Sequence, residues 1–442
     1  MADRQPGRLR GYVPSVRRLG PRPESGASLP WPAVETLATR VAVVGAGPAG
    51  AALAFALASR GTPVALLERQ LDFAREFRGE VITPGGVRAL RALGLGAELG
   101  AVPHQVPDGF ALYRGRHPFL ELPIDPAAFG DAPPVLASQP HLLEAIVARA
   151  AAHPGFTFLR GATAKELLRE GGRAAGVRAS TDAGEVQVLA DLVVGADGRA
   201  SRVRRQDDFA CETRDAPMDV VWCKLPWPEA WGARRPVRAH LGGGHLLIAL
   251  PAPTGELQIA WVILKGTFGE LRSRGIEEWV REMAEHVAPD LAAHLLAHRG
   301  EVTRPFLLDV VVDRVRGWAR PGVLLLGDAA HTMSPVGAQG INLALRDVVV
   351  AANHLVPALR AGAKGAQLDA AAARVEPERA REIDTIQRLA SLPPRVVMGR
   401  GRLAALARAL IPLLVSSRLA RGPGLRGAGL FLNGVTDVEL RV

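Results

Sequence analysis

Residues 41–50 read VAVVGAGPAG and join a continuous apolar run to a glycine-rich turn and an alanine-rich segment. The apolar run at residues 41–44 is typical of a strand buried on both faces of a parallel sheet. Residues 48–60 predict a helix that ends at Gly61, and residues 64–67 predict a second buried strand. The order strand, helix, strand is a βαβ unit, which predicts an α/β fold with a Rossmann-type domain.

The three glycines of this segment have different expected roles in a GxGxxG turn. Gly45 allows the tight turn after the strand, Gly47 lets the backbone approach a pyrophosphate, and Gly50 lets the helix pack closely on the strand. The helix N-terminus, where Pro48 needs no backbone donor, presents free N–H groups to phosphates. Glu68 ends the second strand, where an acid binds the ribose hydroxyls of a dinucleotide. This acid favours FAD or NAD over NADP.

Two later segments place an acid just after a buried strand. Residues 191–199 read DLVVGADGR, so Asp197 and Gly198 follow a strand at residues 192–194. Residues 327–331 read GDAAH after a strand at residues 323–326, and residues 334–342 continue as SPVGAQGIN. Each segment offers small residues where the backbone must approach a ligand.

Differences in composition and apolar periodicity along the chain predict four parts. Residues 1–38 lack apolar periodicity and predict a disordered basic extension. A substrate domain of half-exposed antiparallel strands is predicted at residues 106–138 and 207–302, and residues 363–442 predict a helical C-terminal region. The discontinuous dinucleotide-binding domain comprises residues 39–105, 139–206 and 303–362.

Composition excludes several functional classes. The formal charge is +10, but the basic residues are mostly arginines scattered along the chain, and no basic block alternates with aromatics as in nucleic-acid binding. The two cysteines exclude a disulfide framework and a multi-cysteine metal site, and they fit the reducing cytoplasm, where we expect the protein. The apolar stretch at residues 403–415 is too short to span a bilayer. No metal site is predicted.

With these motifs in order, the chain resembles the flavoprotein monooxygenases of the para-hydroxybenzoate hydroxylase type, the group A aromatic hydroxylases. Residues 342–347, NLALRD, are closest to the ubiquinone-biosynthesis hydroxylase branch. The resemblance implies an FAD-binding domain, NADH or NADPH as a transient co-substrate, and O₂. It also implies hydroxylation or epoxidation of an aromatic, polyketide-like or isoprenoid small molecule through a flavin C4a-hydroperoxide.

The sequence leaves other reactions on the same fold open. A flavoprotein dehydrogenase or reductase is the main alternative. A halogenase is disfavoured, because the chain lacks the Trp-x-Trp-x-Ile-Pro segment of that class. A binding protein without flavin is disfavoured by the intact second and third motifs.

The resemblance also implies roles for individual residues. Glu68 would hold the adenosine ribose, Arg78 would reach back to the flavin, and Gln139 would lie near the pyrophosphate. Asp328 would bond the ribityl chain, and Pro335 would lie near the reacting face of the flavin. The expected cofactor-binding residues are Gly45, Gly47, Ala49, Gly50, Glu68, Arg69, Arg78, Gln139, Asp197, Gly198, Asp328, Pro335, Gly337, Gly340 and Asn342.

No protein side chain is singled out as catalytic, because the flavin carries the chemistry. His331 is interpreted as a structural part of its motif, and His240 as an exposed loop histidine. The tryptophans at positions 222, 227, 231, 261 and 279 fit either a plain core or an aromatic-lined substrate pocket.

Overall fold

The strand that begins the fold lies inside an eight-stranded sheet with the order β19-β20-β11-β1-β2-β8. The computed structural model describes residues 35–74, 80–242, 245–398 and 429–442. The five strands from β20 to β8 are parallel, and β9 and β10 extend β11 as antiparallel strands. The strands are β1 (Glu35–Val44), β2 (Val64–Glu68), β8 (Phe156–Arg160), β9 (Thr163–Glu170), β10 (Arg173–Thr181), β11 (Gly184–Gly195), β19 (Ala319–Arg320) and β20 (Val323–Leu325).

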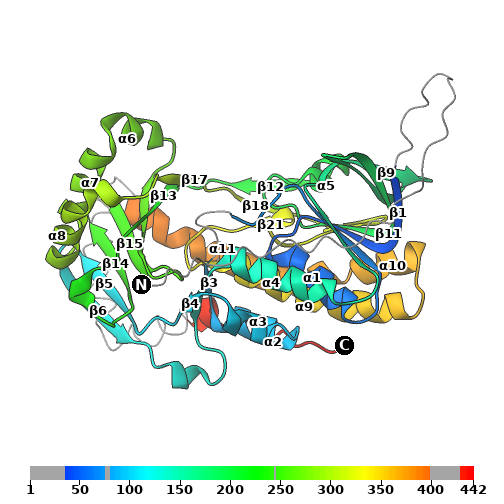
Figure 1. Ribbon diagram of the computed structural model, residues 1–442, viewed down its shortest axis with the longest axis horizontal. Coiled ribbons are helices and arrows are strands. Elements are labelled where there is room, and N and C mark those ends of the chain that lie inside the picture. The colour runs from blue at the N-terminus through cyan, green and yellow to red at the C-terminus, as the bar shows by residue number, and fades with distance from the viewer. Residues whose placement is uncertain (1–34, 75–79, 243–244, 399–428) are drawn as a thin grey trace, which may run out of the picture. The chain divides into compact units, whose positions relative to one another are not determined.

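Helices cover this sheet and bury its central strands. Val41, Ala42 and Val43 have no exposed surface, as expected for a strand covered on both faces. In Figure 1, α1, α4 and α9 lie together along the sheet, and α1 contacts both α4 and α9. The helices of this region are α1 (Pro48–Ala58), α2 (Pro84–Ala92), α3 (Gly96–Ala101), α4 (Gln139–Ala151), α5 (Arg202–Gln206), α9 (Gln339–Arg360), α10 (Gly365–Ala372) and α11 (Val375–Met398).

A second sheet of seven strands has the order β17-β13-β16-β15-β14-β5-β6 and is antiparallel except for the parallel pair β14–β5. One face packs under three helices, with Val221, Ile259 and Trp261 in a shared core with Trp279 and Val280 of the helices. The strands are β5 (Gly109–Arg114), β6 (His117–Pro123), β13 (Met218–Leu225), β14 (Pro236–Gly242), β15 (His245–Pro251), β16 (Leu257–Leu264) and β17 (Phe306–Leu308), and the helices are α6 (Phe268–Arg274), α7 (Ile276–Glu285) and α8 (Pro289–Ala297).

Two three-stranded sheets, β3-β7-β4 and β12-β18-β21, complete the described strands. Their strands are β3 (Val81–Ile82), β4 (His104–Gln105), β7 (Val135–Ala137), β12 (Cys211–Arg214), β18 (Val312–Val315) and β21 (His331–Thr332). No helix in the described ranges is long and apolar enough to cross a membrane.

The fold class is the one predicted: a mixed α/β structure with an inserted antiparallel sheet and C-terminal helices. Two local predictions were wrong. Strand β1 begins at Glu35, which pairs with Val186, so residues 35–38 belong to the sheet and not to a disordered extension. The strands of the substrate domain were predicted to end at residue 302, but β17 lies beyond that residue and pairs with β13 in the seven-stranded sheet. Residues 403–415 lie outside the described ranges, and the division into domains stays a prediction.

Candidate functional site

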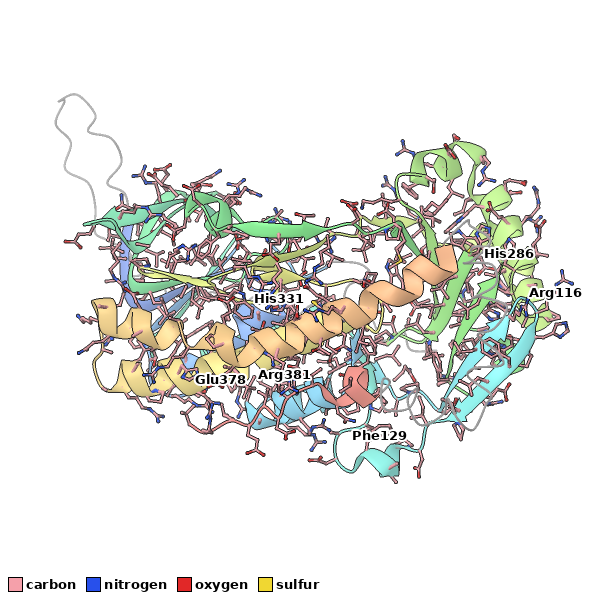
Figure 2. All side chains as sticks on the ribbon, turned by 180° about the vertical axis from the view of Figure 1, so that it is seen from behind. Arg116, Phe129, His286, His331, Glu378 and Arg381 are labelled. Carbon is pink, nitrogen blue, oxygen red and sulfur yellow. The ribbon has the colours of Figure 1, made fainter. Side chains whose placement is uncertain are left out.

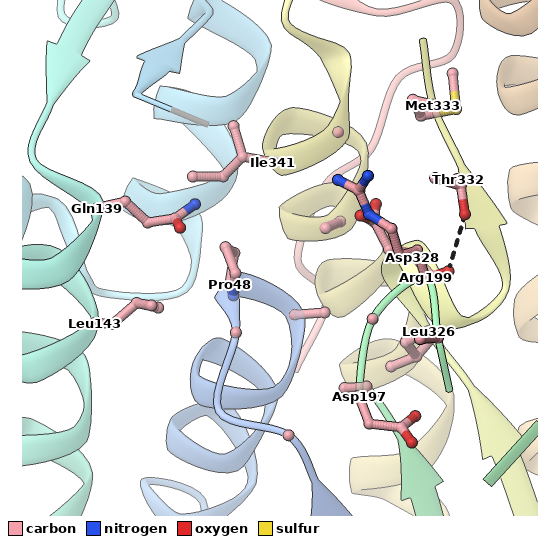
Figure 3. A pocket seen from close by; sticks show the side chains of 18 of the residues that line it. Pro48, Gln139, Leu143, Asp197, Arg199, Leu326, Asp328, Thr332, Met333 and Ile341 are labelled. Atoms are coloured by element: carbon pink, nitrogen blue, oxygen red, sulfur yellow. Dashed lines mark hydrogen bonds between the residues drawn. The ribbon is translucent and has the colours of Figure 1, made fainter. Parts of the chain in front are cut away.

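A cavity of about 510 Å³ extends from the N-terminus of α1 to the seven-stranded sheet. Figure 3 shows Pro48 at the start of α1, with Gln139 of α4 on one side and Asp197, Arg199 and Asp328 on the other. Residues far apart in the sequence therefore meet here. The predicted cofactor residues that line the cavity are Gly45, Gly47, Ala49, Glu68, Arg69, Gln139, Asp197, Gly198, Asp328, Pro335 and Gly340.

The glycine turn has the geometry that a bound pyrophosphate requires. Gly45 has φ +98°, and a Cβ on Gly50 would lie 1.8 Å from the carbonyl oxygen of Gly45. Gly45 is therefore required by its positive φ, and Gly50 by the close approach of α1 to the turn, whether or not a ligand binds. A Cβ on Gly47, in contrast, would meet no atom within 4 Å. The space at Gly47 faces the N-terminus of α1, where free N–H groups and the helix dipole favour an anion.

Glu68 is held against this turn. Its side chain is 4% exposed, its Oε2 accepts a hydrogen bond of 3.0 Å from Ala46 N, and its Oε1 accepts one of 2.9 Å from Gln70 N. The carboxylate is thus fixed at the end of β2, beside the glycine turn. This is the position from which an acid reaches an adenosine ribose.

The second motif closes a loop at the carboxyl end of β11. Asp197 Oδ2 accepts hydrogen bonds from Arg202 N at 2.6 Å and from Val203 N at 3.3 Å, so this carboxylate caps the short helix α5. Gly198 has φ +79°, which suits glycine. Arg199 lines the cavity and donates to the Asp309 carbonyl at 2.7 Å. A hydrogen bond from this loop therefore connects the carboxyl end of β11 to the segment that follows β17.

The third motif places Asp328 and the N-terminus of α9 on the same cavity wall. Thr332 Oγ1 donates to the Asp328 carbonyl at 3.3 Å, the contact drawn in Figure 3. A Cβ on Gly340, in the first turn of α9, would lie 3.8 Å from Asp328 Oδ1. Ala338 precedes α9 in the left-handed conformation, with φ +53°. Both Pro335 and Ala338 line the cavity.

Three predicted cofactor residues do not line the cavity, and Arg78 lies outside the described ranges. Gly50 packs α1 on the turn, and a Cβ on Gly337 would lie 2.6 Å from Phe431. Asn342 donates to the Val81 carbonyl at 3.1 Å and accepts from Thr83 N at 2.9 Å. These residues pack the elements around the cavity, and their role in binding the cofactor stays a prediction.

A buried ionic cluster lies directly behind the third motif. Asp347 accepts from His331 Nε2 at 2.7 Å, from Arg379 Nε at 2.7 Å and from Gly327 N at 3.3 Å. Arg379 also pairs with Glu382. Burial alone would raise the pKa of Asp347, but His331 and Arg379 together lower it. Figure 2 shows His331 beside α11, the helix that carries Arg379 and Glu382. His331 therefore has the structural role expected of it.

At the far end of the cavity, sequence reasoning had left open whether Trp222 lines a substrate pocket, and it missed Glu80 and Gln258. Glu80, Trp222 and Gln258 line it together with apolar side chains of Leu250, Leu308 and Val310. Burial raises the pKa of Glu80 to about 7, although Lys224 and Gln258 act to lower it. The alternation of apolar and polar side chains along β16 could have indicated that Gln258 faces away from the core. Its neighbours Leu257 and Ile259 point to the opposite, helix-covered face of the sheet. Glu80 carries no comparable local signal.

Comparison with known proteins identifies the class to which this site belongs. Residues 38–384 match the FAD binding domain family, and the chain belongs to that family. It is 37% identical to 6-methylpretetramide 4-monooxygenase of Streptomyces rimosus over 88% of this chain and 91% of that protein. It is 30% identical to the ubiquinone hydroxylase UbiL of Rhodospirillum rubrum, over 73% of each chain. The crystal structure of p-nitrophenol 4-monooxygenase PnpA from Pseudomonas putida DLL-E4 has the same fold, with a TM-score of 0.74 at 19% identity, covering 91% of this chain and 100% of that one.

The chain is therefore an FAD-dependent monooxygenase, with NADH or NADPH as its electron donor. The cavity fits the cofactor, because an open space at Gly47 adjoins the helix N-terminus and a buried acid fixed at the end of β2. Bound FAD supplies the transfer of electrons from the nicotinamide to O₂. The protein supplies the phosphate cradle, the walls that exclude water and the orientation of the substrate.

Proposed function

We propose that this monooxygenase hydroxylates a hydroxylated aromatic, polyketide-like small molecule. The observation that carries the proposal is the far end of the cavity, where an indole and aliphatic side chains form the walls and only a few polar atoms intervene. Flat apolar ligands bind in such sites, and the few polar groups fix their orientation. The name of the Streptomyces rimosus relative supports the same substrate class.

We assign the cofactor contacts by their place in the cavity. Gly45, Gly47 and the start of α1 would bind the pyrophosphate, and Glu68 would bind the adenosine ribose. Asp328 would accept a hydrogen bond from the ribityl chain, while Pro335 would lie at the reacting end. The nicotinamide donor would bind transiently near Arg199, because the described part of the chain contains a single glycine-rich βαβ turn. The reducing cytoplasm is the proposed compartment.

The test begins with the purified holoenzyme, which we expect to be yellow from bound FAD. Its flavin is reduced anaerobically in a stopped-flow instrument with NADH or NADPH and then mixed with ¹⁸O₂ and a panel of phenolic polyketides. Incorporation of one ¹⁸O atom into the product, found by mass spectrometry, is the expected result. An oxidised product without ¹⁸O would contradict hydroxylation and favour the dehydrogenase alternative.

A further inference from the structure

The seven-stranded sheet turns two polar side chains toward the cavity. On β16, Gln258 lines the cavity while its neighbours Leu257 and Ile259 pack under the helices. On β13, Trp222 lines the cavity by the same alternation. The antiparallel register pairs Lys224 with Gln258, so Trp222 and Gln258 lie two positions apart on the same face of neighbouring strands.

Glu80 approaches these side chains from a different part of the fold. It directly precedes β3, and its carbonyl accepts a hydrogen bond of 2.8 Å from Ala137 N, which fixes its backbone beside β7. The Gln258 amide lies within hydrogen-bonding reach of the Glu80 carboxyl group. The carboxyl group is therefore held at the cavity wall from two directions.

Three polar atoms at this place are buried and have no hydrogen-bond partner within the described part of the chain. They are Glu80 Oε2, Gln258 Oε1 and Trp222 Nε1, two acceptors and one donor. A buried polar atom without a partner destabilises the protein unless a ligand or water satisfies it. A ligand that satisfies them must bring a hydroxyl or N–H donor to the carboxylate and amide oxygens, and an acceptor oxygen to the indole.

The charge around Glu80 suits proton transfer near neutral pH. Among the described residues, the charged groups that face it are Lys224 on β13 and Glu256 before β16. Burial is the largest effect and raises its pKa, Lys224 and Gln258 lower it, and Glu256 raises it, with a result of about 7. Such a carboxyl group is present in both protonation states at neutral pH, as a general base should be.

We propose that Glu80 is the catalytic base that removes the hydroxyl proton of a phenolic or enolic substrate, while Trp222 Nε1 donates to a carbonyl oxygen of the same molecule. The inference rests on the proposed hydroxylation. The substrate O–H bond breaks, its electron pair stays on the substrate oxygen, and the proton moves to Glu80 Oε2. The increased electron density at the ortho or para carbon favours its attack on the activated oxygen.

The remaining steps return Glu80 to its starting state. The ring carbon gains one atom of O₂ as a hydroxyl group, and its C–H proton leaves when aromaticity is restored. Glu80 then gives its proton back to the substrate oxygen. The second atom of O₂ leaves as water, with two electrons and one proton from NADH or NADPH and one further proton from solvent.

The proposal is tested with oxidised holoenzyme and 4-nitrophenol, a phenol that ionises near neutral pH and whose phenolate is coloured. Difference spectra against the sum of the holoenzyme alone and 4-nitrophenol alone, at the same concentrations and pH, follow the bound phenolate as a function of pH. Two coupled acids that share a proton titrate in two steps. We expect the phenolate band to appear in two steps in the wild-type enzyme and in a single step in Glu80→Gln.

The control is Glu256→Gln, which removes a carboxylate near Glu80 that does not line the cavity. We expect it to keep both steps and to shift the first toward lower pH, because Glu256 raises the pKa of Glu80. The FAD content of each variant checks folding. A single step in the wild-type enzyme, the same as in Glu80→Gln, would overturn the role of Glu80 alone. Absence of any binding would overturn the phenol site itself, and with it the proposed substrate class.

Kinetics give a second measurement with any phenol that the wild-type enzyme hydroxylates. Loss of a general base lowers the rate by about 100- to 10,000-fold, so kcat/KM of Glu80→Gln should fall by that factor and lose its acid limb near pH 7. Trp222→Phe keeps an aromatic ring without the donor and should weaken binding by about two- to tenfold. An unchanged pH profile in Glu80→Gln would contradict the proposal.

Discussion

Gly47→Ala and Gly50→Ala are expected to separate cofactor binding from folding within one turn of chain. At Gly47 the backbone has φ −69° and ψ −176°, which alanine adopts without strain, and the new Cβ would meet no atom within 4 Å. Stability should therefore fall by only about 1 kcal/mol or less, the difference between glycine and alanine at a helix N-cap. The methyl group does, however, occupy the space that a pyrophosphate needs.

Gly47→Ala should therefore mainly weaken FAD binding, whereas Gly50→Ala should mainly lower the stability of the fold. Overpacking costs about 1–3 kcal/mol, so Gly47→Ala should weaken FAD binding by about one to two decades. In Gly50→Ala the Cβ would lie 1.8 Å from the Gly45 carbonyl oxygen, so α1 must move away from the turn. Because backbone cannot yield as a side chain does, we expect a loss of about 3 kcal/mol or more in stability.

Fluorescence titration of the apoprotein with FAD and thermal unfolding of the same samples measure the two effects separately. Wild-type FAD affinity in Gly47→Ala would refute the assignment of this turn to the pyrophosphate. A wild-type Tm in Gly50→Ala would refute the argument from close packing.

Three further predictions concern the second and third motifs. Asp328→Ala should weaken FAD binding by one to two decades, the loss of a charge-assisted hydrogen bond of about 1.5–3 kcal/mol, and an unchanged affinity in an FAD titration would remove Asp328 from the site. Arg199→Ala should slow anaerobic flavin reduction by NADH or NADPH, and unaltered stopped-flow traces would place the donor elsewhere. Asp347→Asn should lower stability by about 3–5 kcal/mol, since it breaks a buried ion pair. The pKa of Asp347 is lowered in the folded protein, so its carboxylate should stabilise the fold above the ordinary carboxyl pKa. That stabilisation should disappear as the pH falls through the folded-state pKa. A plot of Tm against pH should therefore have a shallower acid slope in Asp347→Asn than in the wild-type protein.

The parts of the fold that were predicted correctly depend on local chemistry. Continuous apolar runs identified the buried strands of the parallel sheet, and the φ of Gly45 and the tight contact of Gly50 follow from the strand–turn–helix sequence. Such signals lie within a few residues of each other, so long-range pairing is not needed to read them. The part of the cavity proposed to bind the cofactor could be found from the sequence for this reason.

The far end of the cavity, which we propose binds the substrate, depends on strand register and was not predictable in the same way. His240 was interpreted as an exposed loop histidine, but it is 1% exposed because β14 pairs in parallel with β5 and stacks it 4.3 Å from Tyr113. Burial lowers its pKa to about 4. Among the tryptophans, Trp261 and Trp279 belong to the core under the helices, whereas Trp222 faces the cavity. Alternation along one strand cannot tell which face is the cavity until the neighbouring strands are placed.

The ionic cluster behind the third motif is better explained by geometry than by net stability. Arg346 of α9 also pairs with Glu382, so four charged side chains meet at the junction of α9 and α11: Arg346, Asp347, Arg379 and Glu382. Buried ion pairs recover little more than the desolvation that they cost, so these pairs are weak evidence for stabilisation. Asp347, however, binds Gly327 N and His331 at the two ends of the turn that carries Asp328. Glu382 of the same cluster accepts a hydrogen bond of 2.7 Å from Val435 N near the C-terminus. The cluster thus positions the turn at the cavity relative to α11 and the last residues of the chain, so a substitution within it should disturb FAD binding as well as folding.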